Sequence, residues 1–181
     1  MARKISRRSF IKTSVAAGGA AALLPQSLLS SRMKRKVKLG FIGTGLRGQW
    51  MLWLAAKYPE VEIPAICDID DGMINSALKI LKDAGRPEPK IYKKNEEDFK
   101  AMLDTETMDG VYIATPWEWH HPMAIEAMNN GVHVGTEVPA ALTVKECWDL
   151  VNVSESSGKF CMIMENVCYR RDVMAILNMV R

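Results

Sequence analysis

Three glycines and one aspartate are the residues whose spacing most clearly indicates a binding site. The segment Val37–Trp50 reads V-K-L-G-F-I-G-T-G-L-R-G-Q-W, an apolar strand followed by glycines at 43, 45 and 48. In a G-x-G-x-x-G turn, the first glycine permits a tight turn and the second lets a pyrophosphate approach the backbone, while the third lets a helix pack closely. We therefore expect Gly43, Gly45 and Gly48 to begin a dinucleotide site, with a helix starting near Gln49.

An acid at the expected distance strengthens this interpretation, because glycine-rich turns alone are common. Asp68 lies 20 residues after Gly48 and ends a second apolar segment, Val61–Cys67. A carboxylate there hydrogen-bonds ribose hydroxyls, and the acids Asp70 and Asp71 follow it where a 2′-phosphate site would have an arginine, so the sequence favours NAD over NADP. The alternative is that Asp68 only caps the next helix.

The charge of the chain is unevenly distributed. The total is +3, but nine of the 24 basic residues lie in the first 36 positions, which contain no acid. The other 15 basic residues accompany 21 acids, so the rest of the chain carries −6. A nucleic-acid partner therefore lacks its main electrostatic support.

The basic N-terminal segment has the features of an export signal. Ser6–Lys12 reads S-R-R-S-F-I-K, which resembles the twin-arginine motif, and a weakly apolar run follows over Val15–Leu24. That run is too short to span a membrane, and its side chains are too small. We expect residues 1–36 to be a twin-arginine signal peptide and basic linker that direct the protein to the periplasm; the alternative is a disordered basic tail.

Export by this route bears on the chemistry. The twin-arginine route carries folded proteins, often with a cofactor already bound, and the periplasm supplies little free NAD. An exported NAD protein is therefore favoured to regenerate its own cofactor in each turnover.

Six apolar segments alternate with amphipathic ones along the rest of the chain. Strands are predicted at 37–42, 61–68, 91–92, 110–114, 133–136 and 160–164, and helices at 49–57, 71–84, 96–103, 123–130, 143–157 and 172–181. This order predicts an α/β fold with a doubly wound parallel sheet, a Rossmann domain, over residues 37–165. Because the last helix has an apolar face and ends without a cap, we expect 166–181 to begin a truncated C-terminal substrate domain.

The segment Thr115–Pro122, T-P-W-E-W-H-H-P, follows the strand predicted at 110–114. We expect a loop here, at the edge of the sheet where ligands bind in open α/β folds, with its tryptophans and histidines covering a ligand. Ordinary loop packing is the alternative.

The cysteines and histidines do not form a metal or disulfide pattern. Cys67, Cys147, Cys161 and Cys168 include no C-x-x-C pair, so we expect free thiols, with Cys67 and Cys161 in buried strands. The adjacent His120 and His121 lack helical ligand spacing, and we expect no metal.

Several longer strings resemble a known family. The G-T-G-L-R-G turn, the A-T-P-W-E-W-H segment and T-E-V-P resemble the Gfo/Idh/MocA oxidoreductases from Val37 to the end of the chain. Most members have E-K-P, whose lysine serves catalysis, but Val138 occupies that position here. The strings W-E-W-H-H-P, T-E-V-P-A-A-L-T and M-E-N-V-C-Y-R-R-D are similar to glycoside hydrolase family 109, which contains NAD-dependent α-N-acetylgalactosaminidases.

The resemblance implies a set of site residues. The glycine turn would contribute Leu46 and Arg47, and the segment after the fourth predicted strand would cover the cofactor. Glu137 and Val138 would lie near the nicotinamide ribose, and Asn166 would follow the sixth strand. The residues that would cover the cofactor are Trp117, Glu118, Trp119 and His120. Tyr169 and Arg170 are weaker candidates, either for a substrate pocket or for a structural role.

The resemblance also implies a reaction on an amino-sugar glycoside. NAD would oxidise the sugar 3-hydroxyl, the ketone would acidify the C2 proton and allow loss of the C1 group, and water addition and re-reduction would follow. The alternatives are an ordinary sugar oxidoreductase and a non-catalytic NAD-binding protein. A homo-oligomer is compatible with the sequence.

Overall fold

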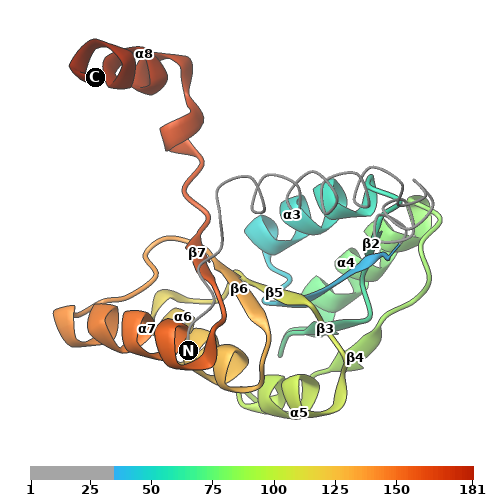
Figure 1. The fold of residues 1–181 in the computed structure, drawn as a ribbon. Coiled ribbons are helices and arrows are strands. Elements are labelled where there is room, and N and C mark those ends of the chain that lie inside the picture. The colour runs from blue at the N-terminus through green and yellow to red at the C-terminus, as the bar shows by residue number, and fades with distance from the viewer. Residues whose placement is uncertain (1–34) are drawn as a thin grey trace, which may run out of the picture. The chain divides into compact units, whose positions relative to one another are not determined.

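The computed structural model describes residues 35–181, in which strands and helices alternate (Figure 1). The predicted leader therefore lies almost wholly outside the described residues. The strands are β1 (Val37–Ile42), β2 (Val61–Glu62), β3 (Ala65–Cys67), β4 (Lys90–Tyr92), β5 (Gly110–Ile113), β6 (His133–Thr136) and β7 (Cys161–Ile163). The helices are α3 (Leu46–Ala56), α4 (Asp71–Asp83), α5 (Asp98–Thr105), α6 (Trp117–Asn129), α7 (Val144–Ser157), the short 3₁₀ helix η1 (Val167–Tyr169) and α8 (Arg171–Val180).

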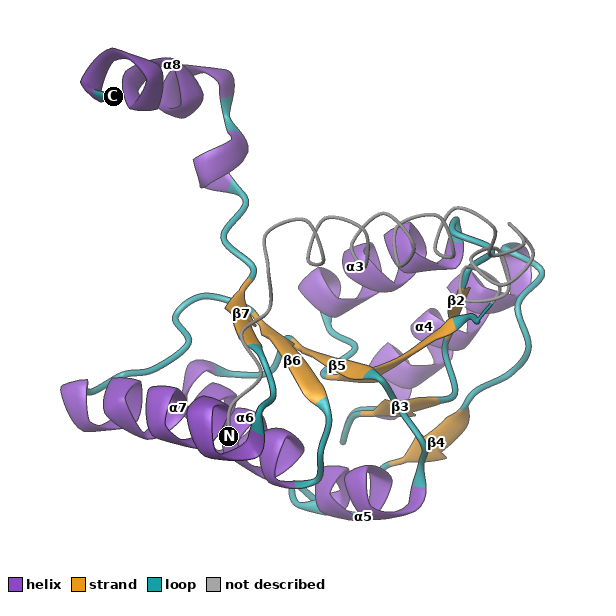
Figure 2. Cartoon of the chain, viewed as in Figure 1, coloured by secondary structure: helices purple, strands orange, loops and turns teal. Residues whose placement is uncertain are grey.

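The strands form one parallel sheet with the order β4-β3-β1-β5-β6-β7, and β2 pairs with the start of β1. Helices α3 and α4 cover one face, whereas α5, α6 and α7 lie on the other (Figures 1 and 2). After β1, the chain adds β3 and β4 on one side of it and then β5, β6 and β7 on the other side. The strand order therefore reverses between β1 and β5. The predicted doubly wound Rossmann fold is confirmed, and its ligand crevice belongs at the carboxyl ends of these two strands.

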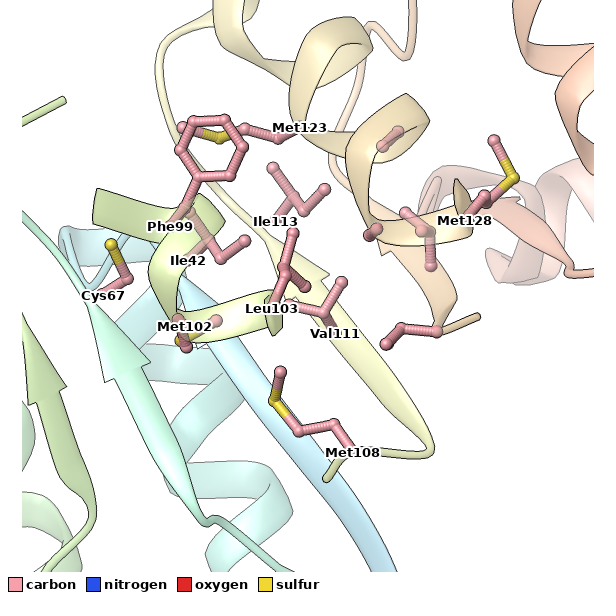
Figure 3. Packing of buried hydrophobic residues seen from close by; sticks show 14 of the residues in the cluster. Ile42, Cys67, Phe99, Met102, Leu103, Met108, Val111, Ile113, Met123 and Met128 are labelled. Atoms are coloured by element: carbon pink, nitrogen blue, oxygen red, sulfur yellow. The ribbon is translucent and has the colours of Figure 1, made fainter. Parts of the chain in front are cut away.

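The core has two layers because the central strands are buried on both faces. Along β1 and β5, Ile42, Val111 and Ile113 pack toward α5 and α6, while Phe41 and Tyr112 pack toward α3 and α4. Figure 3 shows the first layer, in which aromatic and sulfur-containing side chains fill the space between the sheet and its helices: Phe99, Met102, Met123 and Met128. These contacts position β1 and β5 rigidly beneath the glycine turn.

Proline accounts for one difference from the predicted strands. The expected strand at 61–68 is divided into β2 and β3, with Ile63 and Pro64 between them. Pro64 has no backbone N–H to donate to a neighbouring strand, but its carbonyl still accepts from the Lys90 backbone at 2.9 Å. The chain thus stays in the sheet while the regular pairing is interrupted.

Two helices begin earlier than predicted. Helix α3 begins at Leu46 instead of near Gln49, because the Gln49 N–H already bonds the Gly45 carbonyl at 2.8 Å. Helix α6 begins at Trp117, so the expected loop at 115–122 is wrong over most of its length. Pro122 removes only one backbone donor near the start of α6, and the helix continues through it.

The edge strand β7 is less buried than predicted. Met162 is 53% exposed and Ile163 is 52% exposed, and Cys161 is only partly buried, whereas Cys67 in β3 is buried as expected. A strand at the end of the sheet has one neighbour and is covered less completely. Among the helices of residues 35–181, none combines the length and apolar character needed to cross a bilayer.

Helix α7 has the termini that its sequence predicts. The Thr143 hydroxyl accepts from the Glu146 backbone at 3.2 Å, and the Glu146 carboxylate accepts from the Thr143 backbone at 3.1 Å. Gly158 ends the helix at φ 67°, a left-handed conformation that favours glycine. This capping box satisfies backbone donors that would otherwise lack partners.

We expect Thr143→Ala to lower the free energy of unfolding by about 1 kcal/mol, because it removes the side-chain acceptor at the start of α7. Urea unfolding followed by circular dichroism measures the change. Thr143→Ser keeps an acceptor and is the matched control, so equal losses in the two variants would contradict the capping role.

Candidate cofactor site

The glycine turn joins β1 to α3 at the point where the strand order reverses. Gly43 has φ 86°, and a Cβ there would lie 2.6 Å from the Ala114 carbonyl oxygen of the neighbouring strand end. A Cβ on Gly48 would lie 2.1 Å from the Gly43 carbonyl oxygen. Both positions therefore require glycine for the close packing predicted from the sequence. Gly45 differs, because a Cβ there meets no atom within 4 Å and borders open space.

Asp68 points back into this turn. Its Oδ2 accepts from the Thr44 backbone N–H at 2.5 Å and from the Thr44 hydroxyl at 3.0 Å. The alternative that Asp68 caps α4 is wrong, because Asp70 is the N-cap and accepts from the Met73 backbone at 3.0 Å. The carboxylate of Asp68 is thus held beside the glycine turn, where the fingerprint requires the ribose-binding acid.

A crevice of about 410 Å³ lies along the turn. Its lining combines the glycine turn, the end of β3, the segment after β4 and the end of β5, and includes Gly43, Gly45, Leu46, Asp68, Asn95 and Thr115. The space beside Gly45 and the exposed N-terminus of α3 fit a pyrophosphate, and the Asp68 carboxylate fits a ribose diol. The residues present therefore fit a dinucleotide.

Residues that the sequence did not single out complete the crevice. Ile69 borders it from the segment before α4, Met73 from the first turn of α4, and Asn95 and Glu96 from the segment after β4. The rule that ligands bind at the carboxyl ends of parallel strands could have identified Asn95 and Glu96, because β4 ends at Tyr92. Burial raises the pKa of the neighbouring Cys67 thiol to about 12, with Asp98 and Asp68 adding to the effect, so this thiol stays protonated.

The four residues expected to cover the cofactor have different surroundings. Glu118 and Trp119 line the crevice, and Trp119 also packs edge-on against Phe99 with ring centroids 6.3 Å apart. Trp117 is 62% exposed, and His120 is buried. Only two of the predicted covering residues therefore line the crevice, and ordinary packing accounts for part of the segment.

His120 links two strand ends from inside the protein. Its Nδ1 lies 2.7 Å from the Pro139 carbonyl oxygen, and its Nε2 lies 2.8 Å from the Thr115 carbonyl oxygen. Thr115 follows β5, and Pro139 follows β6. The imidazole therefore fixes the spacing of the segments that leave these strands.

A buried carboxylate joins α3, β5 and β6. Glu137 is 9% exposed, and its Oε1 accepts from Arg47 Nε at 2.7 Å and from the Tyr112 hydroxyl. The hydrogen bond that Arg47 donates to Glu137 raises the pKa of Arg47. Burial, and then the hydrogen bond that Tyr112 donates to Glu137, raise the pKa of Tyr112. The Arg47 guanidinium also lies over the Trp50 ring, 5.1 Å from its centroid. Glu137 thus ties the first turn of α3 to the end of β6.

The remaining predicted residues lie at strand ends or beyond, outside the crevice lining. Val138 is 40% exposed and follows Glu137, and Asn166 is exposed after β7. Tyr169 is 71% exposed, and Arg170 pairs with Asp172 at 2.6 Å. Among residues 35–181, no group of three or more histidine, cysteine, aspartate and glutamate side chains is placed to hold a metal ion.

We expect the stability contributed by Tyr112 to depend on pH in the alkaline range. The folded-state pKa of Tyr112 is raised, so above about pH 10 the unfolded chain loses the phenol proton while the folded chain keeps it. The unfolding free energy therefore falls as the pH rises, and Tyr112→Phe removes this contribution.

Tyr112→Phe should cost about 1 kcal/mol at pH 8 by removing a hydrogen bond to Glu137, and the cost should shrink by pH 11. Urea unfolding of both proteins across this range measures the difference. A cost that is constant with pH would contradict the raised pKa of Tyr112 in the folded protein.

Comparison with known proteins agrees with this geometry. Residues 37–165 match the Gfo/Idh/MocA oxidoreductase family with its NAD-binding Rossmann fold. Residues 4–25 match the twin-arginine translocation signal sequence, so the predicted export by this route to the periplasm is confirmed.

Individual relatives give a closer likeness. A glycosyl hydrolase family 109 protein of Parabacteroides distasonis is 49% identical over 97% of this chain, and an alpha-N-acetylgalactosaminidase of Tannerella forsythia is 47% identical over 97%. The chain spans 41% and 42% of their lengths, respectively.

A solved structure, myo-inositol 2-dehydrogenase from Lactobacillus plantarum, is 26% identical and has a TM-score of 0.67. The match covers 81% of this chain and 41% of the dehydrogenase chain. The predicted resemblance to family 109 is confirmed by the named relatives, and the sheet, the glycine turn and the family match agree on the cofactor. The chain belongs to the Gfo/Idh/MocA oxidoreductase family, and its cofactor is NAD.

Proposed function

We propose that the chain is the NAD-binding part of a glycosidase that acts on amino-sugar glycosides, in the manner of an α-N-acetylgalactosaminidase. The observation that carries the proposal is the 47% identity, over 97% of the chain, to a protein named alpha-N-acetylgalactosaminidase. The proposed reaction proceeds by oxidation at the sugar C3, elimination of the C1 group, addition of water and re-reduction. When bound, NAD supplies the acceptor and later the donor of the C3 hydride.

In this proposal the described residues bind and orient the cofactor. The N-terminus of α3 and the open side of Gly45 receive the pyrophosphate, and Asp68 accepts hydrogen bonds from the adenosine ribose. Leu46, Glu118 and Trp119 line the same crevice and flank the cofactor in it. Arg47 and Glu137 act together, since their ion pair fixes the first turn of α3 against the end of β6.

The end of β6 supports a division of tasks between cofactor binding and proton transfer. Val138 is apolar and cannot take a proton, in contrast to the lysine of the E-K-P pattern. Glu137 already accepts from Arg47 and Tyr112 through one oxygen. We therefore assign the proton transfers at the sugar to neither Glu137 nor Val138, and their roles are to shape the nicotinamide end of the site.

Two further functions have specific support. The likeness to myo-inositol 2-dehydrogenase, at 26% identity, favours an oxidoreductase that releases an oxidised sugar. A non-catalytic NAD-binding protein is favoured by Val138, because the described strand end lacks the lysine that serves catalysis in most of the family. The twin-arginine signal favours the glycosidase over the oxidoreductase, because a reaction with no net redox change needs no supply of NAD after export.

We expect Gly45→Ala to weaken NAD binding roughly tenfold while leaving folding intact. The added Cβ meets no protein atom within 4 Å, so it extends only into the space assigned to the pyrophosphate. Titration calorimetry with NAD measures the affinity. Urea unfolding without nucleotide is the control and should change by less than about 1 kcal/mol. Unchanged NAD affinity in a folded Gly45→Ala protein would contradict the pyrophosphate assignment.

The glycosidase proposal is tested with p-nitrophenyl α-N-acetylgalactosaminide, on protein in which this NAD-binding part is joined to the rest of the proposed glycosidase. We expect p-nitrophenol release with no net absorbance of NADH at 340 nm, because the cofactor is oxidised and reduced in each turnover. In deuterated water, the released sugar should carry deuterium at C2, whereas C3 keeps its original hydrogen. Net NADH formation with free monosaccharide supports the oxidoreductase instead, and bound NAD without any turnover supports the non-catalytic protein.

A further inference from the structure

Thr44, between the first two glycines of the turn, donates two hydrogen bonds to Asp68. Its side chain is fully buried, with 0% exposure. Its backbone N–H lies 2.5 Å from Asp68 Oδ2, and its hydroxyl donates to the same oxygen at 3.0 Å. The partners are 24 residues apart and belong to different strand ends, so this contact crosses from the end of β1 to the end of β3.

The second oxygen of Asp68 has a different environment. Oδ1 accepts from the Asp70 backbone N–H at 3.0 Å. An ionised carboxylate offers about four acceptor positions. Thr44 occupies the two on Oδ2, and Asp70 occupies one of the two on Oδ1. The remaining position is therefore on Oδ1, beside a crevice that Asp68 lines together with Gly45 and Ile69.

We propose that Thr44 is a positioning residue for cofactor selectivity. By holding Oδ2, Thr44 fixes the plane of the Asp68 carboxylate and presents one acceptor, on Oδ1, to a hydroxyl of the adenosine ribose. A fixed carboxylate accepts from a 2′-hydroxyl but cannot turn away from a 2′-phosphate. This inference rests on the proposed ribose contact of Asp68 and adds the residue that enforces it.

The chemistry of threonine explains why the hydroxyl matters. Without the hydroxyl, the Asp68 carboxylate keeps one backbone donor on each oxygen, from Thr44 on Oδ2 and from Asp70 on Oδ1. The hydroxyl adds a second donor on Oδ2 and restricts the rotation of the carboxylate further. Valine has nearly the same shape and lacks the hydroxyl, and serine keeps the hydroxyl in a smaller side chain. The pair of substitutions separates the hydrogen bond from the packing of a buried residue.

The experiment measures the dissociation constants of NAD and NADP by titration calorimetry for the wild type and its variants. For Thr44→Val we expect the preference for NAD over NADP to fall about fivefold, less than the tenfold or more that losing a direct hydrogen bond to a charged group costs, because Thr44 acts on the cofactor only through Asp68. Thr44→Ser should keep the preference within roughly twofold of the wild type. Thr136→Val is the matched control, because Thr136 is also 0% exposed and its hydroxyl does not contact Asp68.

A ratio unchanged in Thr44→Val, or lowered equally in Thr136→Val, would overturn the inference. Thermal unfolding without nucleotide reports whether each variant folds, and Thr44→Ala replaces the valine variant if that protein does not fold. The variant Asp68→Asn separates the ribose contact of Asp68 from the positioning role of Thr44. If Asp68→Asn leaves the ratio unchanged, the ribose role of Asp68 fails. If Asp68→Asn lowers the ratio and Thr44→Val does not, only the role of Thr44 fails.

Discussion

The close packing of the turn between β1 and α3 is the constraint on which the rest of the site depends. The Gly43 carbonyl oxygen lies where any side chain on Gly48 would begin, and the Ala114 carbonyl lies where a side chain on Gly43 would begin. These contacts bring α3 against the end of β1 and both against β5. The N-terminus of α3 therefore borders the crevice at the reversal of strand order, and the proposed pyrophosphate contact uses its free N–H groups.

The fold could be predicted from the sequence wherever one physical signal dominated. Apolar runs such as Gly110–Ile113 indicate central parallel strands, and the Thr143–Glu146 pair indicates a helix start, because each signal is local. The starts of α3 and α6 were harder to predict, since a helix extends into a glycine turn or past Pro122 when tertiary packing outweighs local propensity. Pro64 carried a signal for the break between β2 and β3, but the length of the apolar segment concealed it.

The site could be predicted as a set of strand ends but not as a set of contacts. The glycine turn and Asp68 followed from spacing, whereas the pairing of Arg47 with Glu137 joins residues 90 positions apart. No local pattern indicates which donor a carboxylate will face across a sheet. Asp68 and Asp70 illustrate the limit on a small scale. Both are acids after β3, and only the folded chain distinguishes the helix cap from the carboxylate that faces Thr44.

Two carboxylates at the carboxyl edge of the sheet, one after β3 and one after β6, are held by protein donors, and this arrangement favours binding over acid–base chemistry. Asp68 accepts from Thr44 and Asp70, and Glu137 accepts from Arg47 and Tyr112. A general base needs an acceptor that can reach the proton it removes, whereas an oriented anion serves recognition and charge balance. The apolar Val138 adds no proton acceptor to this edge. An edge built in this way fits the proposal of a cofactor that stays in place through oxidation and reduction, because protein donors already hold both carboxylates in position.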